Sequence, residues 1–136
     1  MNKYLLIFVL AFSSLYANDV IQQRQESMQD FNKLMRSATQ MLKNGEVQRT
    51  DEIYQKIESI MLKYPTLFPD DSFNGKTSAS VKIIDDRDVF EQLSKEASDL
   101  AALAKIAANN DDLELIQQHH QNLFGTCKSC HSRFKN

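Results

Sequence analysis

Two cysteines and a histidine stand together near the end of this chain of 136 residues, in the segment Cys127-Lys-Ser-Cys-His131. Two Cys three residues apart, followed at once by His, form the attachment signature of a c-type haem. On a helix with about 100° per residue, Cys130 lies about 60° to one side of Cys127 and His131 about 40° to the other. Both thiols can then add to haem vinyl groups while the neutral imidazole binds the iron. The segment predicts one covalent haem c, with Cys127 and Cys130 as thioether anchors and His131 as the proximal axial iron ligand.

Three other chemistries use similar residues. A thioredoxin-like redox pair belongs at a strand-to-helix junction, and no strand pattern precedes Cys127. A disulfide between residues three apart within a helix has poor geometry, although export would allow one. A closed zinc site needs four ligands, and the only further His residues are His119 and His120, two to three turns earlier. His120 falls on the apolar face and is expected in the core or at an interface, while His119 is expected to face solvent. The spacing favours haem over these alternatives.

Four stretches of the chain repeat apolar residues at helical spacing, and these stretches must position the site. They cover residues 19–44, 47–64, 85–109 and 111–135. Gly45 follows the first stretch, where a left-handed cap would end a helix, and Pro65 ends the second. The chain has only 3 Gly and 2 Pro, which leaves few places for tight turns. The pattern predicts an all-α domain, an antiparallel up-down-up-down four-helix bundle.

In such a bundle the fourth helix ends near the point where the first begins. A site near residue 130 should therefore draw its partners from residues 20 to 35. The connection from Pro65 to about Ile84 is nearly 20 residues long, which is unusual for an idle loop in a compact domain. We expect this connection to cover part of the site.

The first residues resemble an export signal. Lys3 supplies a short positive region, an apolar run covers 4–12, and the small residue Ala17 precedes a polar stretch. We predict cleavage after Ala17, so that residues 1–17 are a signal and residues 18–136 form the haem-binding domain. The apolar run of about nine residues is too short for stable membrane insertion, which takes roughly 20.

Composition argues against binding to nucleic acid. The 16 basic side chains are scattered among 18 acidic ones, and removal of the signal takes away one basic residue and no acidic one. The remaining chain keeps a small negative charge without a basic stripe.

The haem motif on the last of four helices resembles the cytochrome c′ family, class II c-type cytochromes that include low-spin relatives and are standard examples of the four-helix bundle. The resemblance covers nearly the whole chain after the signal. It rests on the segments Gly125-Thr-Cys-Lys-Ser-Cys-His131, with Lys135 four residues on, Arg24-Gln-Glu-Ser-Met28 and Ile83-Ile-Asp-Asp-Arg-Asp-Val-Phe90. The tryptophan that some members have early in the third helix is replaced here, at Ile84.

The resemblance assigns roles to four further residues. It implies that Arg24 approaches the haem propionates, that Gln25 touches the haem edge and that Met28 faces the iron on the distal side. It also implies a basic residue, Lys135, on the proximal face. Haem contacts within 68–84 are expected only as a region. The spacing of these residues agrees with the implied roles. Arg24 and Met28 are four residues apart on one helical face, and so are His131 and Lys135.

Two of these residues also have ordinary interpretations. Met28 lies on an apolar face with Phe31 and Met35, so it could line the pocket or simply pack in the core rather than bind the iron. Arg24 could reach solvent on its long stem, although a buried haem carboxylate would give it a reason to lie on that face.

These observations predict an exported, periplasmic, monohaem c-type cytochrome that transfers single electrons between redox protein partners. The alternative is a gas-binding cytochrome c′ whose iron keeps an open distal position for NO or CO. An enzyme is not expected, because no acid–base pair or nucleophile constellation is present. The family often dimerises, so a homodimer is a further expectation from the resemblance.

Overall fold

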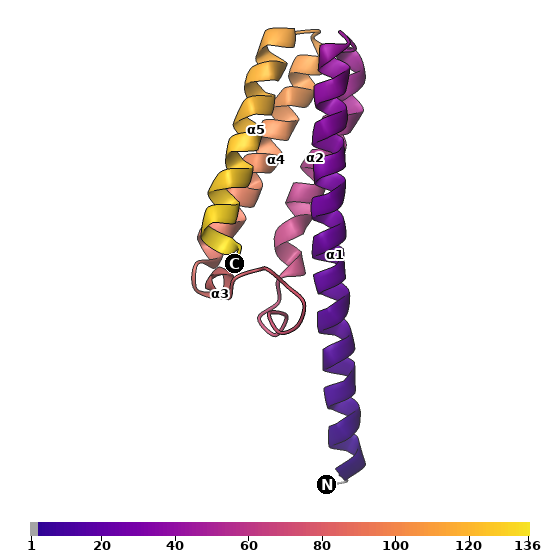
Figure 1. Cartoon of the computed structure of the whole chain (residues 1–136), viewed down its shortest axis with the longest axis vertical. Helices are drawn as coiled ribbons and strands as arrows, with labels where there is room; N and C mark the ends of the chain where they lie inside the picture. The colour runs from indigo at the N-terminus through magenta and orange to yellow at the C-terminus, as the bar shows by residue number, and fades with distance from the viewer. Residues whose placement is uncertain (1–2) are drawn as a thin grey trace.

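The computed structural model describes residues 3–136, with side chains from residue 16 onward except residue 18. Four long helices run side by side, and they are α1 (Lys3–Lys43), α2 (Asp51–Lys63), α4 (Arg87–Asn109) and α5 (Leu113–Phe134). A one-turn helix, α3 (Lys82–Asp85), and two 3₁₀ turns, η1 (Gln48–Thr50) and η2 (Tyr64–Leu67), lie in the connections. Successive long helices alternate in direction (Figure 1). The predicted all-α four-helix bundle is confirmed.

The ends of the helices follow from local sequence. Gly45 has φ +76°, the left-handed conformation predicted for the cap of α1, and its amide donates to the Leu42 carbonyl at 3.2 Å. Asp112 caps α5 by accepting a hydrogen bond from the Leu115 amide at 3.0 Å. Pro65 does not end helical structure abruptly, because it sits in the first turn of η2, where its missing N–H costs nothing.

The first helix is longer than predicted. It begins at Lys3 rather than at Asp19, and its N-terminal part extends beyond the bundle (Figure 1). Because residues 3–43 contain no Gly or Pro, nothing in the sequence interrupts the helix. The side chains of residues 1–15, on which the predicted export signal depends, lie outside the described part. Within residues 3–136, no helix has the length and apolar character needed to cross a membrane.

An alanine face on α4 brings the other helices close. Five alanines, each at most 2% exposed, turn toward the bundle interior: Ala97, Ala101, Ala104, Ala107 and Ala108. They pack with Tyr54 and Ile57 of α2 and with Leu123 of α5 in one core cluster. Small side chains at a helix contact shorten the distance between axes. As a result α4 packs closely against both α2 and α5, and these are the two most extensive helix contacts of the bundle.

One polar network crosses this core, and it contains the predicted core histidine. His120 is 7% exposed and Tyr54 is fully buried. The imidazole Nδ1 lies 2.9 Å from the Tyr54 hydroxyl, and its Nε2 lies 2.9 Å from the hydroxyl of Thr39 on α1. The Thr39 hydroxyl donates to the Met35 carbonyl, so the imidazole Nε2–H donates to Thr39 and Tyr54 donates to Nδ1. This network joins α5, α2 and α1 away from the candidate site.

His119 differs from the expectation that it faces solvent. Its side chain is half-buried, and its Nδ1 is buried without a hydrogen-bond partner in the described structure. Successive residues on a helix are about 100° apart, so a direct neighbour of the buried His120 lies at the border of the buried face and not opposite to it.

Acidification should weaken the bundle through His120. Burial lowers the pKa of His120, because the charged imidazole loses hydration and Tyr54 already donates to Nδ1. The unfolded chain then binds this proton more readily, so stability falls as the pH drops below about 6.5 and through the lowered folded pKa. We expect His120→Leu to cost roughly 1 to 3 kcal/mol at neutral pH and to lose part of this pH dependence. Urea unfolding between pH 7.5 and 5 measures both effects.

His119→Leu is the control, since it removes an adjacent imidazole whose Nδ1 has no hydrogen-bond partner among the described residues. An equal pH dependence in wild type and His120→Leu would contradict the assignment.

Candidate functional site

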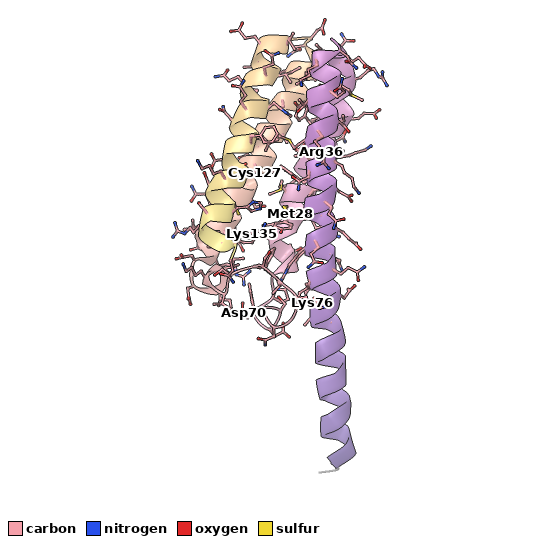
Figure 2. All side chains as sticks on the ribbon, in the orientation of Figure 1. Met28, Arg36, Asp70, Lys76, Cys127 and Lys135 are labelled. Carbon is pink, nitrogen blue, oxygen red and sulfur yellow. The ribbon has the colours of Figure 1, made fainter. Side chains whose placement is uncertain are left out.

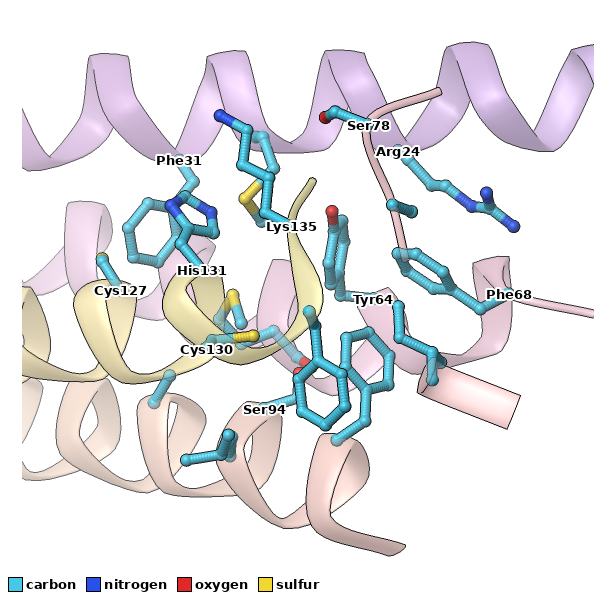
Figure 3. A pocket seen from close by; sticks show the side chains of 18 of the residues that line it. Arg24, Phe31, Tyr64, Phe68, Ser78, Ser94, Cys127, Cys130, His131 and Lys135 are labelled. Atoms are coloured by element: carbon cyan, nitrogen blue, oxygen red, sulfur yellow. The ribbon is translucent and has the colours of Figure 1, made fainter. Parts of the chain in front are cut away.

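A pocket of about 240 Å³ opens between α1 and α5, near the C-terminal end of the chain. Figure 3 shows it bounded by α1 on one side and by α5 on the other, with aromatic rings closing one end. Its α1 wall comes from residues 21–32 and its α5 wall from residues 126–134. These are the two segments that the bundle topology brings to the same end, as the sequence predicts.

The wall formed by α5 carries the thiols and the imidazole. Cys127 and Cys130 are half-buried free thiols, and both line the pocket together with His131. Figure 3 shows the imidazole directed from α5 toward α1, beside Phe31. Burial lowers the pKa of His131, and the charge of Lys135 lowers it further, so the imidazole is neutral with a lone pair to donate. Helical geometry places all three groups on one side of α5.

Both thiols are un-ionised at neutral pH. Burial raises the pKa of Cys127, whose thiol donates to the Leu123 carbonyl at 3.5 Å. Burial and the neighbouring Cys127 raise the pKa of Cys130 to about 11. A reactive redox thiol requires the opposite shift, toward the thiolate. The environment therefore does not favour a thioredoxin-like pair.

The opposite wall comes from α1. Met28 and Phe31 line the pocket there, with Asn32 at its edge. Met28 is half-buried and lies on the side of α1 that faces α5 (Figure 2). Its thioether therefore faces the wall that carries His131, across the space of the pocket.

The connection between α2 and α4 closes the end of the pocket, as its length suggests. Phe68, Thr77, Ser78, Ala79 and Ile83 contribute to the lining. The strand-like segment around Ala79 pairs with Lys135, through hydrogen bonds from the Ser80 amide to the Phe134 carbonyl and from the Asn136 amide to the Ser78 carbonyl, both 2.8 Å. This pairing ties the connection to the end of α5.

Ile84, which stands where some family members have tryptophan, does not line the pocket. Ile84 is 38% exposed, whereas its neighbour Ile83 is 1% exposed and lines the pocket. The reason is a helix break: α3 ends at Asp85, and Asp86 leaves helical geometry at φ −110°, ψ 36° before α4 begins. The residues before the break therefore do not share the phase of α4.

The two polar residues predicted on α1 also reach this connection. Arg24 lines the pocket, is 3% exposed, and donates from Nε to the Leu67 carbonyl at 2.6 Å. Gln25 lines the pocket edge and donates from Nε2 to the Lys76 carbonyl at 3.0 Å. Lys135, on the last turn after α5, lines the pocket beside His131 (Figure 3).

Sequence reasoning missed the aromatic end of the pocket. Tyr64, Phe68, Phe90 and Phe134 form a chain of edge-to-face and tilted ring contacts with centroids 4.7 to 6.3 Å apart. Tyr64 is half-buried and lies between Lys135 and Phe68 in Figure 3. Burial raises the pKa of its phenol, which stays protonated. The available signal was the pair Tyr64 and Phe68, two aromatic residues four positions apart whose rings meet with centroids 5.1 Å apart.

These features fit a haem. A flat apolar macrocycle fits a slot lined by Met, Phe and Ala, and its iron needs a neutral imidazole. The thiols stand where covalent tethers would hold it, and Arg24 and Lys135 are the basic groups available for its carboxylates. Among the described residues, no three His, Cys, Asp or Glu gather into a metal-binding cluster.

Comparison with known proteins decides the family. Residues 19–135 match the family described as Cytochrome C′. The chain belongs to the cytochrome c′ family. The match begins two residues after the predicted cleavage point and extends to Lys135.

Two relatives in the family match this chain in sequence. Cytochrome c′ of Rhodopseudomonas palustris is 33% identical over 123 residues, which cover 86% of this chain and 82% of the relative. Cytochrome c′ of Rhodospirillum rubrum is 36% identical over 88 residues, but these span only 60% of the relative and 64% of this chain.

Solved structures share the fold at lower identity. Cytochrome c prime from Shewanella frigidimarina has 24% identity and a TM-score of 0.80, with 88% of this chain and 96% of that chain covered. A nitric oxide complex of a cytochrome c prime variant from Alcaligenes xylosoxidans has 17% identity and a TM-score of 0.78, with the same shares covered. As a member of the cytochrome c′ family, this chain binds one covalent haem c, and the predicted cofactor is confirmed.

Loss of Arg24 should destabilise this end of the molecule. Arg24→Leu would leave the Leu67 carbonyl and the Ser72 carbonyl buried without their donor. Hydrogen bonds to a charged group contribute about 1.5 to 3 kcal/mol, and we expect a loss of at least this size in urea unfolding. Arg36→Leu is the matched control, because Arg36 is exposed on the same helix (Figure 2). Equal stability losses in the two variants would contradict this account.

Proposed function

We propose that this member of the cytochrome c′ family is an exported electron-transfer protein, with Met28 and His131 as the two axial ligands of its iron. Residues 1–17 act as the export signal, residues 18–136 form the periplasmic haem domain, and the partners are redox proteins. The haem supplies the one-electron couple. The chain's own residues hold the haem, exclude water from it and set its potential.

The assignment of the site follows the walls of the pocket. Cys127 and Cys130 tether the haem to α5, and His131 binds the proximal side of the iron. Arg24 and Gln25 meet the haem carboxylates and edge, and Lys135 lies on the proximal face. The support is that all of these side chains line one pocket.

The observation that carries the electron-transfer proposal is the placement of Met28. Its side chain lines the pocket from α1 while His131 lines it from α5, so a haem between them has an imidazole on one face and a thioether on the other. Met and His ligation saturates the iron and raises its potential, which suits electron transfer. An unbranched Met can adapt its side chain to reach a metal.

A second candidate is gas binding. It is supported by the nitric oxide complex described for the structurally similar protein from Alcaligenes xylosoxidans. In this function Met28 only lines the distal side, the iron keeps an open position, and NO or CO binds there. Both functions use the same residues of the site, and they differ only in the role of Met28.

Carbon monoxide distinguishes the two functions in the unaltered protein. Carbon monoxide binds reduced haem iron only at an open or easily opened position. The proposed function predicts that saturating carbon monoxide leaves the Soret band of the reduced protein unchanged over minutes. Rapid and complete formation of the carbon monoxide spectrum would reject electron transfer by a six-coordinate iron and favour gas binding.

A further inference from the structure

Arg24 is a buried cation without a carboxylate beside it. Its side chain is 3% exposed, and no ion pair found among residues 16–136 includes it. A buried charge is costly unless it is paired or hydrogen-bonded. Because no carboxylate compensates this charge, the hydrogen-bond acceptors around the guanidinium must stabilise it.

The segment from Leu67 to Phe73 encloses the guanidinium. Nε donates to the Leu67 carbonyl at 2.6 Å, Nη1 donates to the Ser72 carbonyl at 3.0 Å, and Nη2 donates to the Ser72 hydroxyl. The guanidinium carbon also lies 4.0 Å from the centroid of the Phe68 ring and 5.3 Å from that of Phe73. Because arginine has five N–H groups, this arrangement leaves two of them for an anion.

Ser72 supplies two of the three acceptors and is itself fully buried. Its hydroxyl donates to the Pro69 carbonyl at 2.5 Å, and its amide donates to the same carbonyl at 3.0 Å. Since a serine hydroxyl has one hydrogen, that hydrogen is committed to Pro69 and only the oxygen lone pairs face Arg24. Ser72 is thereby oriented as an acceptor for Arg24 and for no other described residue.

We propose that Ser72 is a positioning residue that sets the reduction potential of the haem through Arg24, by fixing the guanidinium where its two remaining N–H groups meet a haem carboxylate. This inference rests on the proposed role of Arg24 at the haem. It adds that the connection between α2 and α4, through one serine, determines how strongly the charge of Arg24 acts on the iron.

The direction of the effect follows from charge. A fixed cation near the haem disfavours the oxidised iron, which is more positive, and so raises the reduction potential. Arg24→Gln removes the cation and should lower the potential. Ser72→Ala keeps the cation but removes one of its acceptors, so the guanidinium is less fixed and the potential should fall by a smaller amount.

The experiment is a double-mutant cycle in the haem-loaded protein, read out by voltammetry. Variants Ser72→Ala, Arg24→Gln and the double variant are compared with wild type, and spin state is recorded by absorption. Ser80→Ala is the matched control, because Ser80 is a buried serine of the same connection whose hydroxyl accepts from the Lys82 amide and does not contact Arg24. We expect Ser72→Ala to lower the potential in the wild-type background and to have no effect in the Arg24→Gln background.

Other outcomes contradict the inference in different ways. An unchanged potential in Ser72→Ala, or an equal shift in both backgrounds, would mean that Ser72 does not act through Arg24. An unchanged potential in Arg24→Gln would instead reject the proposed role of Arg24, and with it this inference. A high-spin wild type would reject the proposed ligation of the iron by Met28. It would leave the inference about Ser72 standing, because the cycle compares reduction potentials among variants that share the same distal side.

A second variant covers the case in which Ser72→Ala does not fold. Ser72→Cys keeps the shape of the side chain with a somewhat larger atom, and its thiol is only a weak hydrogen-bonding group. It should lower the potential in the same direction as Ser72→Ala, and a potential equal to that of wild type would overturn the inference.

Discussion

Replacing Cys127 and Cys130 by serine is expected to abolish covalent haem attachment completely. The two thiols line the pocket on α5, one turn apart, and the part of the chain that the structure describes contains no other cysteine. Serine keeps the size and helical position of each side chain but forms no thioether. In a denaturing gel stained for haem, wild type should keep its stain and the double variant should lose it entirely.

Single variants and a neighbouring control sharpen this test. Cys127→Ser and Cys130→Ser should each retain one tether and reduced haem content, whereas Ser129→Ala should match wild type, because Ser129 is exposed between them. A wild-type band from which acid and acetone extract all haem would contradict covalent attachment. A stained double variant would show attachment elsewhere.

Replacing Met28 by alanine is expected to change the spin state of the iron and open it to ligands. If the thioether is the distal ligand, its loss leaves the iron bound to His131 alone on that axis. The other α1 residues that line the pocket are not common ligands of haem iron, and they are Ile21, Arg24, Gln25, Phe31 and Asn32. The oxidised protein should turn high-spin, the reduction potential should fall, and the reduced protein should bind carbon monoxide rapidly. Absorption spectra with and without carbon monoxide measure the change.

Met41→Ala is the matched control for this variant. Met41 is a half-buried methionine of the same helix that packs on the core and does not line the pocket. Each variant should cost about 2 to 5 kcal/mol of stability as a Met-to-Ala change, but only Met28→Ala should alter the spin state. If Met28 merely covers the distal face, wild type is already high-spin and its substitution only speeds the entry of gas.

The architecture was predictable because it depends on patterns along single helices. Apolar spacing identified the four long helices, and the alternating topology brought residues 20–35 to the same end as His131. The cysteine and histidine spacing named the cofactor without any tertiary information, since all three groups lie within five residues. Gly45 likewise ended α1 as its left-handed conformation requires.

The rest of the site depends on contacts between distant segments. Nothing in the sequence indicates that Arg24 donates to carbonyls 43 and 48 residues away, because backbone acceptors carry no residue signature. Sequence spacing also did not indicate that Ile83 rather than Ile84 turns into the pocket, because the break at Asp86 resets the helical phase. The helix start was wrong because no Gly or Pro separates residues 3–18 from the rest of α1.

The aromatic end of the pocket was missed for a similar reason. Tyr64 begins the 3₁₀ turn after α2, Phe68 directly follows that turn, and Phe134 lies on the last turn of α5. Their ring contacts with Phe90 arise only when the connection folds back over the bundle.

The visible absorption spectrum of the oxidised wild-type protein at neutral pH shows whether Met28 binds the iron. We expect a low-spin iron with the weak charge-transfer band in the far red that arises from a sulfur ligand on ferric haem. A high-spin spectrum without that band would contradict ligation by Met28, and it would make gas binding the better description of this cytochrome c′.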